Sequence, residues 1–327
     1  MSSRRDFLKT TAAGALALGA QGALGLPEKK ADAAKPKVVV ARDAALHGNG
    51  GQLDEKRVQA LLDRAIATYT GHSNPVDSWK QIVPVGKVIG LKVNGLGGKG
   101  ISTHHALTMA VCERLQQAGV KPSQIIIWEQ RTNFLEACGF QISNDPSKIR
   151  TLSSDVHGYE SQEVSFGSAM VKLAKALSLC DMVIGLPILK DHSMAGLTFA
   201  MKNMYGVVER PQDLHATGCN PAVADLNCIP AIREKVRFTI GDAMSSVYNG
   251  GPSFHPEHLW QPNALIVGQD RVAVDHTAWQ MLERKRAEVG MPTLEAAKRP
   301  PSYIATAADA AHGLGVNDPK RIQLMEV

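Results

Sequence analysis

The stretch Asp181–Leu189, "DMVIGLPIL", is apolar at almost every position and decides the fold class. A strand with one face in water alternates apolar and polar residues, whereas this run predicts a strand covered on both faces. Other apolar runs, "KVVVAR" (37–42) and "QIIIWE" (124–129), alternate with helical patterns such as "DEKRVQALLDRAIATY" (54–69). This alternation predicts an α/β fold with a mostly parallel sheet flanked by helices.

Further strands are predicted at "KVIGLKVN" (87–94), "RFTIGDA" (237–243) and "NALIVGQD" (263–270), and helices at 104–118, 170–180 and 273–289. The segment from about 203 to 262 is rich in Gly, Pro, Asn and His. Such segments inside compact domains are usually functional, so we expect an irregular, lid-like segment over the carboxyl edge of the strands. Residues 34–327 are expected to form a single domain.

Residues 1–33 are expected to be removed from the mature protein. "SRRDFLK" (3–9) precedes an apolar, alanine-rich stretch, and "ADA" (31–33) offers a small-residue cleavage site. These features resemble a twin-arginine (Tat) export signal, which implies the Tat machinery as a partner and a periplasmic location. No other run is long and apolar enough to cross a bilayer, so we expect a mature form that does not span the membrane.

The composition excludes some partners and cofactors. The formal net charge is only +5, and no basic patch with interleaved aromatic residues stands out, so nucleic acid is not an expected partner. The five cysteines, Cys112, Cys138, Cys180, Cys219 and Cys228, form no C-x-x-C pair and no iron–sulfur motif. We expect the first three to be buried as small apolar side chains.

Polar residues follow the predicted strands, namely Asn94, Glu129 to Arg131, Lys190 to His192, Asp242 and Asp270. The carboxyl ends of parallel strands share one edge of a sheet, where ligands of open α/β folds bind. The sequence therefore predicts a ligand-binding cleft at this edge, lined by Glu129 and Asp242. Asp270 is also placed to cap the helix that follows it.

The pattern Gly95-x-Gly97-x-x-Gly100 after a predicted strand is the written form of a dinucleotide-binding fingerprint. Ser102 or Thr103 is the natural N-cap of the next helix, so the third glycine lies before that helix rather than within its first turn. We therefore expect a loop suited to a small anion, with Lys99 nearby, in place of a nicotinamide site.

The densest group of candidate site residues lies in "PILKDHSMAGLTFAMKNMYGVV" (187–208). Lys190, His192 and Lys202 are the catalytic candidates, and Asn203, Lys92 and Asn94 are expected to bind the ligand. A lysine in apolar surroundings has a lowered pKa and can act as a base or nucleophile, while His192 is expected to bind a metal or carry a proton. The alternative is a lysine that extends to solvent, with His192 as a helix cap.

These residues carry a resemblance. "KVIGLKVN", the stretch 187–208, "RFTIGDAM" and "NALIVGQDRVAVD" together resemble the family named domain of unknown function 362 over nearly the whole mature chain. Its most specific pattern, K-x-H-x(5)-T-x(3)-KN-x-x-G, is matched by Lys190, His192, Thr198, Lys202, Asn203 and Gly206. Some relatives carry iron–sulfur modules, which implies a redox setting, but this chain lacks the cysteines for one.

The block "H-x(2)-AGLTFAMK" (192–202) is also similar to a block of nickel-pincer lactate racemases. That likeness implies a histidine-held metal, a lysine-tethered organic cofactor and a small carboxylate substrate. His255 and His258 are further metal candidates, because their spacing puts both on one face of a helical turn beginning at Pro256. The alternative for this pair is two histidines of a surface loop.

Together these observations predict an exported enzyme whose strand-end cleft binds a small anionic or carboxylate ligand. A metal or metal–organic cofactor and either isomerase or redox chemistry are consistent with them. Two alternatives stay open: a periplasmic protein that captures an oxyanion or metabolite without catalysis, and an accessory protein of a redox system.

Overall fold

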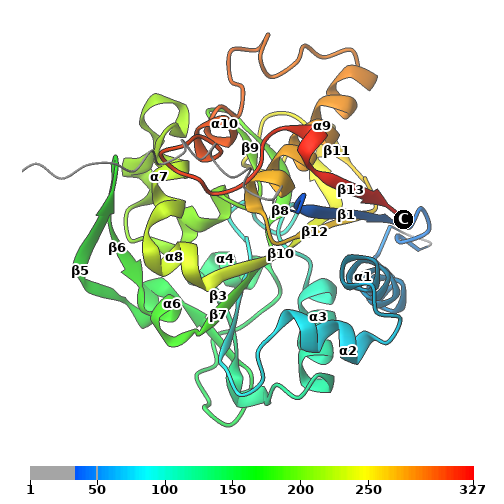
Figure 1. Ribbon diagram of the computed structural model, residues 1–327, viewed down its shortest axis with the longest axis vertical. Helices are drawn as coiled ribbons and strands as arrows, with labels where there is room; N and C mark the ends of the chain where they lie inside the picture. The colour runs from blue at the N-terminus through cyan, green and yellow to red at the C-terminus, as the bar shows by residue number, and fades with distance from the viewer. Residues whose placement is uncertain (1–33, 49–50) are drawn as a thin grey trace, which may run out of the picture. The chain divides into compact units, whose positions relative to one another are not determined.

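The described part of the protein is built on one mixed sheet of 11 strands (Figure 1). Eight of them follow the order β13-β1-β12-β10-β7-β2-β3-β4, and β8, β9 and β11 extend the sheet along β10. The strands are β1 (Lys37–Arg42), β2 (Ile89–Lys92), β3 (Ile125–Glu129), β4 (Arg150–Ser153), β7 (Met182–Gly185), β8 (Ile188–His192), β9 (Gly196–Thr198), β10 (Val236–Val247), β11 (Leu259–Trp260), β12 (Ala264–Gly268) and β13 (Gln323–Glu326).

The computed structural model describes residues 34–327 except 49 and 50, and Lys35–Val327 form one compact unit. The predicted export signal, residues 1–33, lies outside the described residues. No helix of the described part is both long enough and apolar enough to cross a bilayer.

Strands β10, β7, β2, β3 and β4 run parallel, which confirms the predicted α/β fold with a mostly parallel sheet. Three strands are antiparallel to their neighbours: β12 to β1 and β10, β11 to β10, and β9 to β8. The carboxyl end of β12 therefore lies opposite the carboxyl ends of the parallel strands, so Asp270 does not share their edge, and its predicted role as a helix cap is confirmed. Asp270 accepts 2.9 Å hydrogen bonds from the backbone amides of Val272 and Ala273 at the start of a helix.

Helices cover both faces of the sheet (Figure 1). They are α1 (Glu55–Thr70), α2 (Pro75–Ile82), α3 (His105–Gln117), α4 (Thr132–Ala137), α5 (Ser154–His157), α6 (Lys175–Leu179), α7 (Ala222–Cys228), α8 (Pro230–Lys235), α9 (Arg271–Glu288) and α10 (Tyr303–Ala307). Along β1, Val39 and Ala41 pack with α1 to α3, whereas Val38 and Val40 pack with the layer that contains α7, α9 and α10. These residues of β1 therefore pack against helices on both faces of the sheet, as the continuous apolar runs predicted.

The run 181–189 forms two strands rather than one. Pro187 has no amide hydrogen for a ladder bond, and the break between β7 and β8 falls there. The carbonyl oxygen of Pro187 accepts a 2.7 Å bond from the amide of Asp242, so the chain continues along β10 after the break. This shift carries Lys190 and His192 beyond the end of β7.

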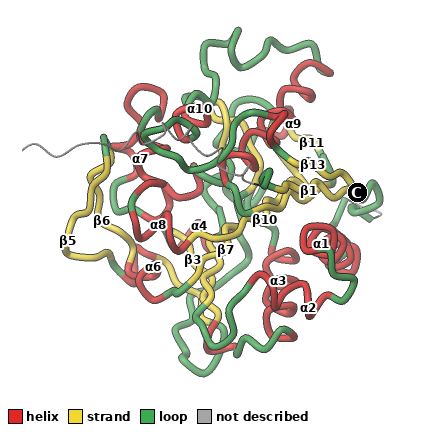
Figure 2. The backbone as a smooth tube through the Cα atoms, viewed as in Figure 1, coloured by secondary structure: helices red, strands yellow, loops and turns green. Residues whose placement is uncertain are grey.

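The helix predicted at 170–180 was wrong over its first half. Residues 169–174 form β6 (Ala169–Ala174), which pairs with β5 (Tyr159–Phe166) in a separate hairpin (Figure 2). Val171 and Leu173 face inward while Met170 is exposed. Inward and outward side chains that alternate in this way are typical of a strand, although the same residues also fit a helical pattern. Only α6 is helical in this stretch.

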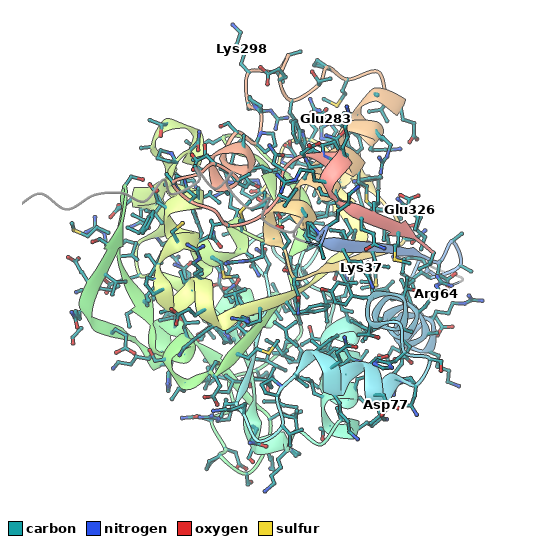
Figure 3. All side chains as sticks on the ribbon, viewed as in Figure 1. Lys37, Arg64, Asp77, Glu283, Lys298 and Glu326 are labelled. Atoms are coloured by element: carbon teal, nitrogen blue, oxygen red, sulfur yellow. The ribbon has the colours of Figure 1, made fainter. Side chains whose placement is uncertain are left out.

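The segment 203–262 is more regular than expected, because it contains α7, α8 and the 12-residue strand β10. The two longest parts without strand or α-helix are 203–221, which contributes to the cavity described below, and 248–258, which does not line it. A second irregular extension follows α9, and Figure 3 shows Lys298 at its outer end.

Candidate functional site

A cavity of about 390 Å³ lies beyond the carboxyl ends of β2 and β3 and beside the antiparallel pair β8 and β9. Asn94, Glu129, His192 and Thr198 come from the ends of these four strands, and Lys202, Asn203 and Tyr205 come from the 3-10 helix Lys202–Val207. His215 and Gln212 come from the 3-10 helix Pro211–Cys219, and the lining also includes Leu96, Arg131 and Phe134.

A fully buried network underlies one side of the cavity. Lys92 Nζ lies 3.1 Å from Glu129 Oε1 and donates a 2.6 Å hydrogen bond to the carbonyl of Val93. The same carboxylate accepts hydrogen bonds from the backbone amides of Gly95 and Gln130. Glu129 is therefore fully engaged by the protein, and its charge is offset by Lys92.

Asn203 connects this buried network to Asn94 in the cavity wall. Its Oδ1 accepts a 3.1 Å hydrogen bond from Asn94 Nδ2, and its Nδ2 donates to the carbonyl of Lys92. Gly206 follows on the same 3-10 helix, and a Cβ there would lie 2.7 Å from Lys92 Nζ. The glycine of the family-like pattern therefore allows the helix backbone to approach the buried lysine.

Lys190 is completely buried and donates a 3.0 Å hydrogen bond to Asn94 Oδ1. Burial lowers the pKa of its amine to about 7, against an opposing effect of Glu129. Lys190, a predicted catalytic residue, does not line the cavity, but it orients the amide of Asn94, which does.

His192 has a defined tautomer. Its Nδ1 accepts two 3.1 Å hydrogen bonds, from the backbone amides of Met194 and Ala195, so the ring proton sits on Nε2. Burial and the nearby Lys202 lower the pKa of His192 to about 2, which keeps the ring neutral. His192 thus offers an N–H donor to the cavity and lacks the free lone pair that a metal would need there.

Lys202 and His215 lie side by side in the cavity wall, with Lys202 Nζ 3.3 Å from His215 Nε2. Because His215 Nδ1 lies 2.8 Å from the carbonyl of Pro211 and donates to it, Nε2 accepts from the lysine. The amine of Lys202 also lies 3.8 Å from the centre of the Tyr205 ring, a cation–π contact. Burial lowers the pKa of Lys202 to about 8 and also lowers that of His215.

Three predicted ligand residues do not line the cavity, and one of them, Lys92, is completely buried beneath it. Lys99 is exposed and does not line the cavity. Asp242 is fully buried and accepts hydrogen bonds from the backbone amide and ring Nδ1 of His104, at 2.9 and 2.7 Å. Burial alone would lower the pKa of His104, but the Asp242 carboxylate outweighs it and raises that pKa. Asp242 therefore fixes the start of α3 instead of meeting a ligand.

The glycine loop is packed by protein atoms. A Cβ at Gly95 would lie 1.8 Å from the Phe134 carbonyl oxygen, and one at Gly100 would lie 2.4 Å from the Phe254 ring. The loop ends before α3 begins, as expected for a pattern that is no dinucleotide fingerprint, but the N-cap of α3 is His104 and not the predicted Ser102 or Thr103. Its glycines permit close packing, and the expected anion site at Lys99 finds no support in this geometry.

His215 is the residue that sequence reasoning missed. It lies in a segment without regular periodicity, and only the packing of this segment against Lys202 and Tyr205 brings it to the cavity. The predicted histidine pair lies on the separate stretch 248–258, where His255 and His258 flank Glu257. The predicted burial of Cys112, Cys138 and Cys180 is confirmed, and burial raises the pKa of the Cys112 thiol to about 12.

The fold and site define an α/β protein with a cationic cavity at the carboxyl edge of its parallel strands. The model of the family described as domain of unknown function (DUF362) matches residues 89–280, and the chain belongs to this family, as the resemblance predicted.

Two solved structures are similar at low identity. One is a crystal structure of a protein from Thermotoga maritima, with 13% identity, a TM-score of 0.44, and coverage of 73% of this chain and 60% of that one. The other is the lactate racemase apoprotein from Thermoanaerobacterium thermosaccharolyticum, with 12% identity, a TM-score of 0.38, and coverage of 71% and 54%. The chain thus spans little more than half the length of either structure. Comparison with curated proteins finds no match.

Proposed function

We propose that the protein is an exported enzyme that binds a small carboxylate or related oxyanion and moves a proton on it, as an isomerase does. The observation that carries the proposal is the pair formed by the buried Lys202 and the half-buried His215 in the cavity wall, with Nζ and Nε2 3.3 Å apart. A lysine with a pKa of about 8 beside a neutral imidazole with one accepting nitrogen is suited to acid–base work near neutral pH.

The charges of the site favour an anion. Lys202 lines the cavity, Arg131 is exposed at it, and the carboxylate of Glu129 is already paired with Lys92. His192 Nε2 supplies a neutral donor, and the buried Thr198 Oγ1 has no hydrogen-bond partner among the described residues. A bound oxyanion would satisfy both groups, since buried polar atoms rarely stay unpaired.

In this proposal Lys202 donates to the negative charge on the ligand and passes the abstracted proton to or from His215 Nε2, whose lone pair faces the Lys202 amine. Asn94, oriented by Lys190, and Asn203 hold the ligand on the side of β2. The donor set does not fit a metal held by His192, because Nδ1 of that ring accepts two amide hydrogen bonds. No step through a metal or metal–organic cofactor is therefore proposed.

Binding is tested by thermal shift and calorimetry of the mature protein against a panel of small hydroxy, keto and amino acids. Binding by the wild type that is lost in Lys202→Met, but kept in Lys99→Met, supports the site. Lys99 is an exposed lysine outside the cavity, so it controls for the removal of one positive charge. Binding that survives Lys202→Met would place the ligand elsewhere and contradict the proposal.

Catalysis is tested by the exchange of ligand carbon-bound hydrogen with D₂O, followed by NMR. Exchange that disappears in His215→Gln, with ligand binding retained, supports the enzyme. Tight binding without exchange would instead identify a periplasmic binding protein. Export is tested separately by replacing Arg4 and Arg5 with lysine, which should hold the protein in the cytoplasm.

A further inference from the structure

We propose that His255, Glu257 and His258 bind a divalent transition metal at a surface site that is separate from the cavity and independent of the proposed reaction. These residues lie on the stretch 248–258, between β10 and β11. None of the three lines the cavity.

The donor atoms already lie close to one another. One ligand atom from each residue falls within 4.8 Å of the other two. His255 Nδ1 is 3.1 Å from Glu257 Oε1, and His258 Nδ1 is 3.8 Å from the same oxygen. Ligands bonded at about 2.0–2.2 Å to one ion lie roughly 3 to 3.5 Å apart, so small side-chain rotations complete the set.

A second observation points to a missing partner. His258 Nδ1 is buried and has no hydrogen-bond partner among the described residues. Its other nitrogen, Nε2, lies 3.4 Å from the side-chain amide of Asn249. A metal on Nδ1 would place the ring proton on Nε2 and would replace the long contact of this nitrogen with Asn249. The Asn249 amide itself stays in place, because its oxygen accepts hydrogen bonds from Arg286 and Arg299.

The backbone of this stretch is held in place without the metal. Gly251 N donates to Asp191 Oδ2, Ser193 N donates to the Gly251 carbonyl, and Tyr248 N donates to the His258 carbonyl. Gly250 has a φ of 80°, and a Cβ there would lie 2.9 Å from the His255 ring. Glycine at this turn therefore lets the backbone pass beside the first ligand.

The donor set selects the class of metal. Two imidazoles and one carboxylate suit zinc, nickel or copper, whereas magnesium and calcium prefer oxygen ligands throughout. The carboxylate is exposed, so water can complete the coordination shell. The metal would thus have three protein ligands, and its remaining coordination positions would be open to water.

The test is calorimetric titration of the metal-free mature protein with ZnCl₂ and NiCl₂. We expect one ion per chain, with affinity at least tenfold weaker in His255→Ala and in His258→Ala. Glu257→Gln, an exposed isosteric change, should also weaken binding while its circular dichroism spectrum stays that of the wild type. His72→Ala removes another exposed histidine and should bind like the wild type.

Absence of stoichiometric binding would overturn the proposal. So would wild-type affinity in both His255→Ala and His258→Ala, or loss of the ion in His215→Gln, which would move it to the cavity. Because the readout is metal binding alone, failure of the carboxylate assays does not affect it.

Discussion

The amine of Lys92 lies 3.1 Å from Oε1 of Glu129, and the two side chains are 0% and 3% exposed. This pair occupies the carboxyl ends of β2 and β3, directly below the cavity. A buried charge that loses its partner is strongly destabilising, whereas removal of both charges is often tolerated.

Glu129→Gln should therefore lower the free energy of unfolding by about 3–5 kcal/mol, because it leaves the Lys92 ammonium buried without its counter-charge. Urea denaturation measures the loss. The double variant Lys92→Met/Glu129→Gln should recover most of it. A double variant no more stable than Glu129→Gln would mean that the cost does not arise from the unpaired lysine.

Lys190 should make stability rise with pH. Its amine has a pKa of about 7 in the folded protein and an ordinary value of 10.5, so between these values the unfolded chain binds more protons. From pH 7 to pH 10 the wild type should gain stability on the order of 3 kcal/mol relative to Lys190→Met. Urea denaturation of both proteins at the two pH values gives this difference, and an unchanged difference would show that the lysine is not desolvated.

His192 should remain neutral between pH 4 and pH 9, with its proton on Nε2, because burial and Lys202 lower its pKa to about 2. Nitrogen-15 NMR of the imidazole rings reports both the charge and the tautomer, and His192→Gln identifies the resonance. A transition near pH 6, or a proton on Nδ1, would contradict the donor role and reopen metal ligation by this residue.

Gly206→Ala should disturb the site through Lys92. The new methyl group would lie 2.7 Å from Lys92 Nζ and 3.3 Å from Glu129 Oε2, so the pair or the helix must move. We expect a loss of about 1–3 kcal/mol in thermal or urea unfolding, together with weaker ligand binding. Gly185→Ala is a matched control, since a Cβ there meets no atom closer than 3.9 Å. Equal losses in the two variants would refute the close-approach argument.

Much of the fold could be predicted because strands covered on both faces are apolar without alternation. Strand direction leaves no such trace, so the antiparallel β12 was not predicted, and Asp270 was assigned to the wrong edge. Residues 170–174 satisfy both a helical and a strand period, and their pairing with β5 decides between the two. The break between β7 and β8 falls at Pro187, but the residues on both sides of Pro187 are apolar, so the run was predicted as one strand.

The strand-end argument placed Asn94, Glu129 and His192 together, and the structure puts all three at one cavity. The argument could not detect His215, because that residue arrives on an irregular segment whose position depends on tertiary packing. It also assigned Asp242 to the ligand site, whereas the carboxylate of Asp242 is hydrogen-bonded to His104 at the start of α3. Residues at one sheet edge share a neighbourhood, but hydrogen-bond partners decide which of them remain free for a ligand.

The pairing of β1 with β13 has a consequence for the order of events in the cell. Val38, Val39 and Val40 in the first strand are paired on one side with Leu324, Met325 and Glu326, almost 290 positions later in the chain. That side of β1 cannot be covered until residues 323–326 have been synthesised. The first strand must therefore wait for almost 290 further residues before both of its edges are paired.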